Sequence, residues 1–151
     1  MAAAFERDAI RLFLGTEQPI LLGLTFEGAS KEVTLAGEQK RGGFYNYFIG
    51  SDPSKWQSQV TAYSSLLYHG LYDGIDVRVR EEAGRLEYDL LLAPGADLAQ
   101  VVIRADGTTG LSLEGDGSLL LTTAEGSLRQ TLPRTWEELP TGEKRAVQSR
   151  V

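Results

Sequence analysis

The sequence predicts an all-β protein, a mainly antiparallel β-sandwich built of short hairpins and a meander, with little or no helix. Glycine is frequent, with 17 residues among 151, and it separates short runs rich in Leu, Val, Ile, Thr and Tyr. Asp-Gly and Glu-Gly pairs recur in the second half of the chain. Such pairs supply the positive φ that tight hairpin turns require, and closely spaced turns are typical of a sandwich or an open barrel. We therefore expect residues 1–151 to form a single sandwich domain.

The first half predicts short strands separated by turns. Strands are expected at Ala9–Leu14, Ile20–Phe26, Lys31–Leu35 and Phe44–Ile49, with a polar, glycine-rich loop over Ala36–Gly43. At Ser51–Ser54 we expect a turn, and Pro53 is equally suited to begin a short helical turn with Asp52 as its N-cap. Gln59–Ser64 and Leu66–His69 then predict two short strands or one bent strand, followed by a corner at Gly70–Asp73.

The clearest pattern is a hairpin between Ile75 and Leu92. Apolar side chains alternate with charged ones on its first strand, which predicts one buried face made of Ile75, Val77 and Val79. Opposite charges, such as Arg78 or Arg80 against Glu87, are expected to pair across the two strands. The end of the return strand, Leu90–Leu92, is apolar on both faces, which predicts a central position between two layers.

The second half predicts further short strands joined by glycine turns. They are expected at Val101–Arg104, Leu111–Leu113, Ser118–Thr123, Ser127–Leu132 and Arg145–Val151. The last of these would end in mid-strand, so we expect the chain to be a fragment of a larger multidomain protein.

Composition excludes several classes of function. The chain has no cysteine, which excludes disulfides and thiolate chemistry. Its net charge of −6 argues against nucleic acid as a partner, because nucleic-acid binding needs clustered Lys and Arg. The acidic excess lies between Gly70 and Asp116, with ten acidic and four basic residues, as expected for a solvated acidic surface. No apolar run approaches the roughly 20 residues that span a bilayer, so we expect no membrane insertion, and the N-terminus does not resemble a signal peptide.

Catalytic and metal patterns are weak, and the sequence predicts no enzyme and no cofactor. The one histidine, His69, follows an aromatic strand and is expected to be structural. Asp73, Asp76, Glu87 and Asp89 would suit a glycosidase pair only at the right separation across a cleft, and carboxylates at turns more commonly cap them. Calcium is the alternative cofactor, since oxygen ligands recur on flexible turns, although no EF-hand spacing is present. These turns are Asp73–Asp76, Asp106-Gly107 and Glu114–Gly117.

Aromatic residues give the remaining functional signal. Trp56 with Tyr63, Tyr68 or Tyr72 would form a ligand-binding platform if these rings are exposed, because Tyr and Trp stack on sugar rings and anchor interfaces. If they are buried, the same rings fill the core of the sandwich. The sequence alone leaves both interpretations open.

The ordered segments NYFIGSDPSKW, VTAYSSLLYHGLYDGIDVRV and RLEYDLLLAPGAD resemble a known family. It is the uncharacterised β-domain found near the N-terminus of large bacterial secreted and cell-surface proteins, often ahead of seven-bladed β-propeller (SBBP) repeats or PKD-like and other Ig-like modules. The resemblance covers 44–133. The positions that match its pattern are Asn46, Tyr47, Phe48, Gly50, Asp52, Pro53, Trp56, Val60, Tyr63, Tyr68, Tyr72, Gly74, Ile75, Asp76, Leu86, Tyr88, Asp89, Pro94, Gly95, Ala96 and Asp97.

This resemblance implies a β-sandwich at a secreted or cell-surface location, and it implies no catalytic residue. We therefore expect a non-catalytic structural or adhesion module. Its expected partners are other domains of the same polypeptide and a glycan or protein at the cell surface. A carbohydrate-binding module that uses exposed aromatics is the alternative, and a glycoside-active domain is a third, minor one.

Overall fold

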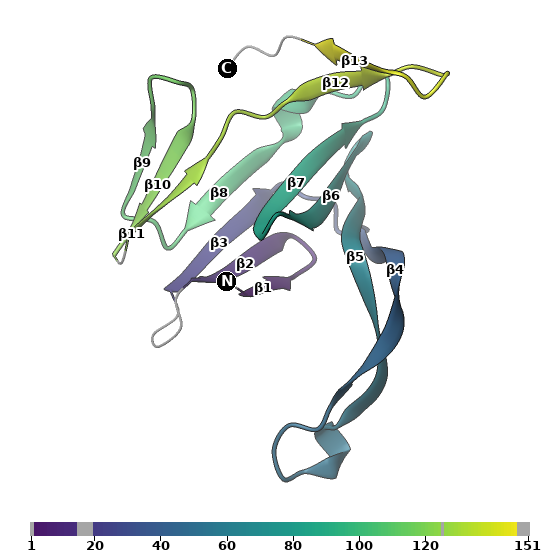
Figure 1. Cartoon of the computed structure of the whole chain (residues 1–151). Helices are drawn as coiled ribbons and strands as arrows, with labels where there is room; N and C mark the ends of the chain where they lie inside the picture. The colour runs from purple at the N-terminus through teal and green to yellow at the C-terminus, as the bar shows by residue number, and fades with distance from the viewer. Residues whose placement is uncertain (1, 15–19, 125, 148–151) are drawn as a thin grey trace. The chain divides into compact units, whose positions relative to one another are not determined.

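The computed structural model describes residues 2–14, 20–124 and 126–147, and these residues form an all-β protein (Figure 1). The predicted fold class is confirmed. The strands are β1 (Ala2–Phe5), β2 (Ala9–Leu14), β3 (Ile20–Glu27), β4 (Thr34–Tyr47), β5 (Gln57–Tyr72), β6 (Ile75–Glu82), β7 (Arg85–Leu92), β8 (Val102–Asp106), β9 (Gly110–Leu113), β10 (Leu119–Thr123), β11 (Gly126–Gln130), β12 (Thr135–Glu138) and β13 (Lys144–Val147). Two short 3-10 turns, η1 (Pro53–Lys55) and η2 (Leu98–Gln100), are the helical elements of the described residues.

The strands assemble into four sheets. Their orders are β1-β2-β3-β8, β4-β5-β6-β7, β11-β10-β9 and β12-β13, and the last three sheets are antiparallel. The described residues group into two compact units. The larger contains Ala4–Ile10 and Leu24–Arg104, and the smaller contains residues 2–3, 11–14, 20–23, 105–124 and 126–147. The assignment of the whole chain to a single domain stays a prediction.

The larger unit buries one face of β5 and β6 together with residues of β2 and β3. Its fully buried side chains include Ile10, Phe26, Tyr68, Leu71, Ile75 and Val77. Ile75, Val77 and Val79 are all buried, which confirms the face predicted from their alternation with charged residues. Burial of these apolar side chains is the main contribution to the free energy that favours the folded state.

Two tyrosines connect distant strands of the larger unit through their hydroxyl groups. The Tyr68 hydroxyl donates to the Ala9 carbonyl oxygen at 3.1 Å, and the Tyr68 ring packs against Phe26 with centroids 5.9 Å apart. The Tyr72 hydroxyl donates to the Glu27 carbonyl oxygen at 3.0 Å. Burial raises the pKa of both phenols above the ordinary tyrosine value, so both remain neutral donors.

The hairpin β6–β7 follows the prediction, with one change in its ion pairs. Arg80 Nη2 lies 3.0 Å from Glu87 Oε2, and Arg80 also pairs with Asp89, so Arg80 lies between two carboxylates of the return strand. Arg78 instead reaches across to β4, where its Nε and Nη2 donate to the two oxygens of Glu38. The expectation of a central position for Leu90–Leu92 is wrong: β7 is the last strand of its sheet, and Leu92 is exposed.

The pair between Glu38 and Arg78 predicts a pH dependence. The hydrogen bond from Arg78 holds the pKa of Glu38 below its ordinary value, and that from Ser65 adds to this effect. A lowered folded pKa stabilises the fold at pH values above the unfolded pKa of about 4.3, and this stabilisation is lost as the pH falls through the folded pKa. We expect Glu38→Gln to cost about 1 kcal/mol at neutral pH, because the pair is partly exposed. Urea unfolding at pH 7 and at pH 3 checks this: the difference from wild type should shrink at pH 3, and an undiminished difference there would contradict it.

The smaller unit contains the three-stranded meander β9–β10–β11, which matches the predicted hairpins within two residues. Leu121 and Ser118 are buried in it. The carboxylate of Asp116 accepts hydrogen bonds from the backbone and hydroxyl of Ser118 and pairs with Arg129 Nη2 at 2.8 Å. The Ser118 hydrogen bonds, together with Arg129, lower the pKa of Asp116 to about 2. Asp116 thus organises the turn before β10.

Several predicted boundaries are wrong in the first half of the chain. The expected loop over Ala36–Gly43 lies inside β4, which runs unbroken from Thr34 to Tyr47, while Lys31 to Val33 precede the strand. Gln59–Ser64 and Leu66–His69 lie on one strand, β5, which was one of the two alternatives that the sequence left open. The corner expected at Gly70–Asp73 is instead a register shift between Tyr68 and Tyr72. The tail adds a hairpin, β12–β13, whose first strand the sequence did not indicate. Residues 148–151 of the last predicted strand lie outside the described residues.

Candidate functional site

The candidate site is the distal part of the hairpin β4–β5, residues 39–63, which we call the arm (Figure 1). β5 pairs with β6 only between Ser65 and Tyr72. Beyond that point, among the residues that the structure describes, β4 and β5 pair only with each other, from Lys40 opposite Tyr63 to Tyr47 opposite Gln57. The arm is therefore a two-stranded ribbon, and among the described residues no third strand of its sheet pairs with it.

Large apolar side chains cover this ribbon and remain in solvent. Residues 39–59 are exposed without interruption. The exposed fractions are highest for Ile49 at 75%, Phe48 at 61% and Phe44 at 60%. The full set of large apolar residues exposed on the arm is Phe44, Tyr45, Tyr47, Phe48, Ile49, Trp56 and Tyr63. Single exposed apolar residues are ordinary, but so many on one short segment make the arm the candidate interaction surface.

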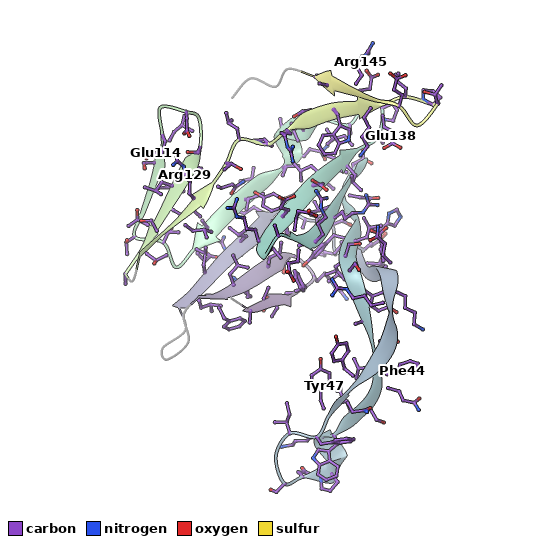
Figure 2. The ribbon with its side chains drawn as sticks, in the orientation of Figure 1. Phe44, Tyr47, Glu114, Arg129, Glu138 and Arg145 are labelled. Atoms are coloured by element: carbon purple, nitrogen blue, oxygen red, sulfur yellow. The ribbon has the colours of Figure 1, made fainter. Side chains whose placement is uncertain are left out.

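Both faces of the ribbon carry rings. Tyr45 and Tyr47, two residues apart, lie nearly parallel at an interplanar angle of 23°, with centroids 6.5 Å apart. Figure 2 shows the side chains of Phe44 and Tyr47 on opposite sides of the ribbon. The ammonium group of Lys40 lies 5.8 Å from the centroid of the Phe44 ring, within the range of a cation–π contact.

Within the arm, β4 contains a β-bulge where its register against β5 shifts. Four positions separate Lys40 from Phe44 on β4, whereas two separate their partners Tyr63 and Thr61 on β5. The extra residues form a bulge, and Gly43 within it has a φ of 91°, which favours glycine. Bulges increase twist and interrupt the ladder, so the open edges of the arm are poor templates for adding another strand.

The end of the arm is an ordered turn rather than a loose loop. Asp52 caps η1, accepting hydrogen bonds from the backbone N–H of Ser54 at 3.1 Å and from its hydroxyl at 2.8 Å. Trp56 Nε1 donates to the Gly50 carbonyl oxygen at 3.2 Å, and the edge of the Trp56 ring meets Phe48 with centroids 5.4 Å apart. These contacts show that the helical turn at Pro53, one of the two alternatives that the sequence left open, is formed, and they fix the positions of the two rings.

Removal of the cap should loosen this turn without unfolding the protein. We expect Asp52→Ala to destabilise the turn locally by about 1 kcal/mol, because two hydrogen bonds to Ser54 are lost. Amide hydrogen exchange of residues 50–56 should speed up about fivefold to tenfold, with unchanged exchange in β6. Equal acceleration in β6 would mean that the cap stabilises the whole unit, contrary to this prediction.

The residues proposed from sequence as a ligand platform do not lie together on one exposed surface. Trp56 and Tyr63 are exposed on the arm, but Tyr68 is completely buried and Tyr72 is 5% exposed. Tyr68 and Tyr72 therefore belong to the core of the larger unit. The ring of Tyr63 covers Gly37, where an added Cβ would lie 2.4 Å from the ring carbons.

The sequence reasoning missed the more exposed members of the arm, Phe44, Tyr45, Tyr47, Phe48 and Ile49. A signal was present in the run FYNYFI. A half-buried strand alternates apolar and polar residues, whereas this run is mostly aromatic at both odd and even positions and lies between a glycine-rich segment and a turn. Such a run indicates a ribbon with rings on both faces.

The carboxylates considered for catalysis or calcium make local structural contacts. Asp76 accepts a hydrogen bond from the Gly70 backbone and lies 3.0 Å from His69 Nδ1. Burial raises the pKa of Asp76, but the contacts with Gly70 and His69 outweigh it and leave the pKa below its ordinary value. Glu87 and Asp89 share Arg80. Among the described residues, no group of three or more acidic or histidine side chains is arranged to hold a metal ion.

Within the part of the chain that the structure describes, no helix has the length and apolar character needed to cross a bilayer.

A family model described as a domain of unknown function, DUF7948, matches residues 15–150. No curated protein and no solved structure matches the chain.

Proposed function

This chain belongs to the DUF7948 family, and we propose that it is a non-catalytic adhesion or structural module of a larger secreted or cell-surface bacterial protein. The arm is its contact element. One observation carries the proposal: seven large apolar side chains lie exposed on a ribbon that is ordered at its tip.

The arrangement of the arm supports contact rather than catalysis. A binding surface gains affinity from aromatic anchors that are already ordered, because less conformational entropy is lost on association. Trp56, with its N–H bonded to Gly50, and Phe48, packed against it, meet this description. The charged groups of the arm do not form a nucleophile–base pair: Asp52 caps a turn, and Arg41 donates to the Ser64 hydroxyl.

The location and the partners rest on the resemblance between 44–133 and the β-domain of large bacterial surface proteins. In such a setting the arm would contact another domain of the same polypeptide, or a glycan or protein on the surface. No nucleic acid is proposed, because the chain carries a net charge of −6.

Carbohydrate binding is the second candidate, and one observation favours it. The nearly parallel rings of Tyr45 and Tyr47 are each about half exposed and present apolar faces of the kind on which sugar rings stack. Trp56 and Tyr63, the exposed members of the platform proposed from the sequence, would extend that surface.

A bead-attachment assay tests the proposed function. Beads that carry the chain are applied to surfaces coated with bacterial polysaccharide, with extracellular matrix protein or with the chain itself. We expect retention on at least one surface, and at least about tenfold less retention for the arm variant Phe48→Ser/Ile49→Ser/Trp56→Ser. The matched control, Leu111→Ser/Leu113→Ser, removes equally exposed side chains on β9 and should retain attachment. Equal retention of both variants, or no retention anywhere, would refute the proposal.

A further inference from the structure

We propose that the partner of the arm is the arm of a second copy of this chain, so that the two ribbons wind around each other in a symmetric dimer. This inference rests on the proposed function, since it names the partner of the same contact element. Two features of the arm favour a second copy, the size of its apolar surface and the presence of rings on both faces, and its distribution of charge provides a test.

The apolar surface is large enough for a stable dimer. An aromatic side chain can bury about 200 Å², and the seven exposed residues of the arm are on average about half exposed. Together they offer on the order of 700 Å², close to the roughly 800 Å² that each partner buries in a standard interface. Two-fold pairing uses the same patch on both copies, so no second surface has to be found.

The shape of the arm disfavours a flat partner. Rings lie on both sides of the ribbon, as Phe44 and Tyr47 do (Figure 2). The turn at the end of the arm contains Ser51, Asp52, Pro53 and Ser54, whose carboxylate and hydroxyl groups favour water. A second ribbon that lies alongside the first can instead cover rings without burying this turn.

The irregular backbone of the arm favours a dimer contact made by side chains over one made by pairing of strand edges. Because Gln39, Gly43 and Gln59 have positive φ values, both strand edges of the arm are irregular. Pairing of backbone edges is therefore disfavoured, and side chains on the faces carry the contact. The core of such an interface would contain Tyr45 and Tyr47 on one side and Phe44 on the other, with Phe48 and Trp56 near the tip.

The charges predict how the dimer responds to salt. The arm holds three basic residues, Lys40, Arg41 and Lys55, and one acidic residue, Asp52, while the remainder of the chain holds twelve basic and twenty acidic residues. A symmetric dimer brings two positively charged arms together, so salt should screen repulsion and preserve or strengthen association. Docking of the arm on the acidic remainder of another copy would instead weaken as salt is added.

The test is sedimentation velocity on the chain from about 1 to about 100 µM, a range that covers moderate affinities, in 0.1 and 1 M NaCl. We expect a concentration-dependent dimer that persists in 1 M NaCl. Phe48→Ser/Trp56→Ser, and separately Phe44→Ser/Tyr47→Ser, should each weaken dimerisation by more than about tenfold. Leu111→Ser/Leu113→Ser should leave it unchanged, and circular dichroism checks that every variant is folded.

The remaining outcomes overturn this inference. A folded chain that is monomeric at 100 µM contradicts it, as does a dimer that is lost in 1 M NaCl or is insensitive to both arm variants. Binding of the monomer to anionic vesicles of phosphatidylglycerol, or to polysaccharide, identifies another partner. If beads attach to polysaccharide through the arm while the chain is monomeric, the proposed function stands and only this inference falls. If neither attachment nor dimerisation occurs, both fall.

Discussion

Tyr68→Ala is expected to lower the free energy of unfolding by about 3–5 kcal/mol, the range for truncating a large buried ring. Tyr68 is completely buried, its ring packs against Phe26, and its hydroxyl donates to the Ala9 carbonyl oxygen. The substitution leaves a cavity between β5 and β3 and removes the hydrogen-bond donor. Urea denaturation followed by far-UV circular dichroism measures the loss.

Two further variants separate the contributions. Tyr68→Phe keeps the ring and removes one hydrogen bond, while the Ala9 carbonyl oxygen still accepts from the backbone N–H of Glu6, so we expect a cost of about 0.5–1.5 kcal/mol. Tyr63→Ala, on the exposed part of the same strand, should cost much less, because Tyr63 is 48% exposed. If Tyr63→Ala proves as costly as Tyr68→Ala, the division of β5 into a buried part and an exposed arm is wrong.

Gly107→Ala is the second substitution with a large expected effect. Gly107 has a φ of 85°, and a Cβ there would lie 2.4 Å from the Leu21 carbonyl oxygen. An alanine pays about 1–2 kcal/mol for the left-handed conformation, and the clash with backbone forces a shift that adds about 1–3 kcal/mol. Thermal and urea unfolding should therefore show a total loss of about 2–5 kcal/mol.

Gly28 provides the matched control for this substitution. Its φ is 72°, and nothing lies within 4 Å of an added Cβ. Gly28→Ala should therefore cost only the conformational contribution, about 1–2 kcal/mol. Equal losses for the two variants would show that the close approach of Gly107 to Leu21 has no energetic consequence.

The sequence predicted the elements whose pattern is local. In the hairpin β6–β7, apolar residues alternate with charged ones and a glycine turn separates two strands, so both the strands and the buried face of Ile75, Val77 and Val79 were predictable. The meander β9–β11 was predictable for the same reason, since its glycine turns fix the hairpins. The cap of η1 by Asp52 was one of two alternatives that the sequence allowed.

The elements that depend on distant partners were not predictable. Gly37, Gly42 and Gly43, with the polar residues among them, have the composition of a loop, yet β4 continues through them because β5 pairs with it on both sides of the bulge between Lys40 and Phe44. The Tyr63 ring occupies the space above Gly37 where a side chain would otherwise lie. Tyr63, which makes this contact, lies 26 positions away in the chain, so the strand propensity of the residues near Gly37 does not reveal it.

The candidate site was predicted only in part, for a related reason. Tyr63, Tyr68 and Tyr72 lie on one strand, and their burial depends on where β6 begins to pair with β5 and on the register shift between Tyr68 and Tyr72. Beyond that shift the neighbouring residues Leu71 and Tyr72 are both buried, so strict alternation does not describe the strand and could not be used to assign its rings. The aromatic density of the segment was visible in the sequence, but its division into core and arm was not.

The most direct test of the account is hydroxyl-radical footprinting of the chain over a range of concentrations. At low concentration, Phe44, Phe48 and Trp56 should be oxidised readily while Tyr68 is protected. At high concentration, the three arm residues should become protected, and Leu111 and Leu113 should stay reactive. An exposed arm is contradicted if the three arm residues are as protected as Tyr68 in the dilute chain. Pairing of two arms is contradicted if their reactivity is the same at every concentration.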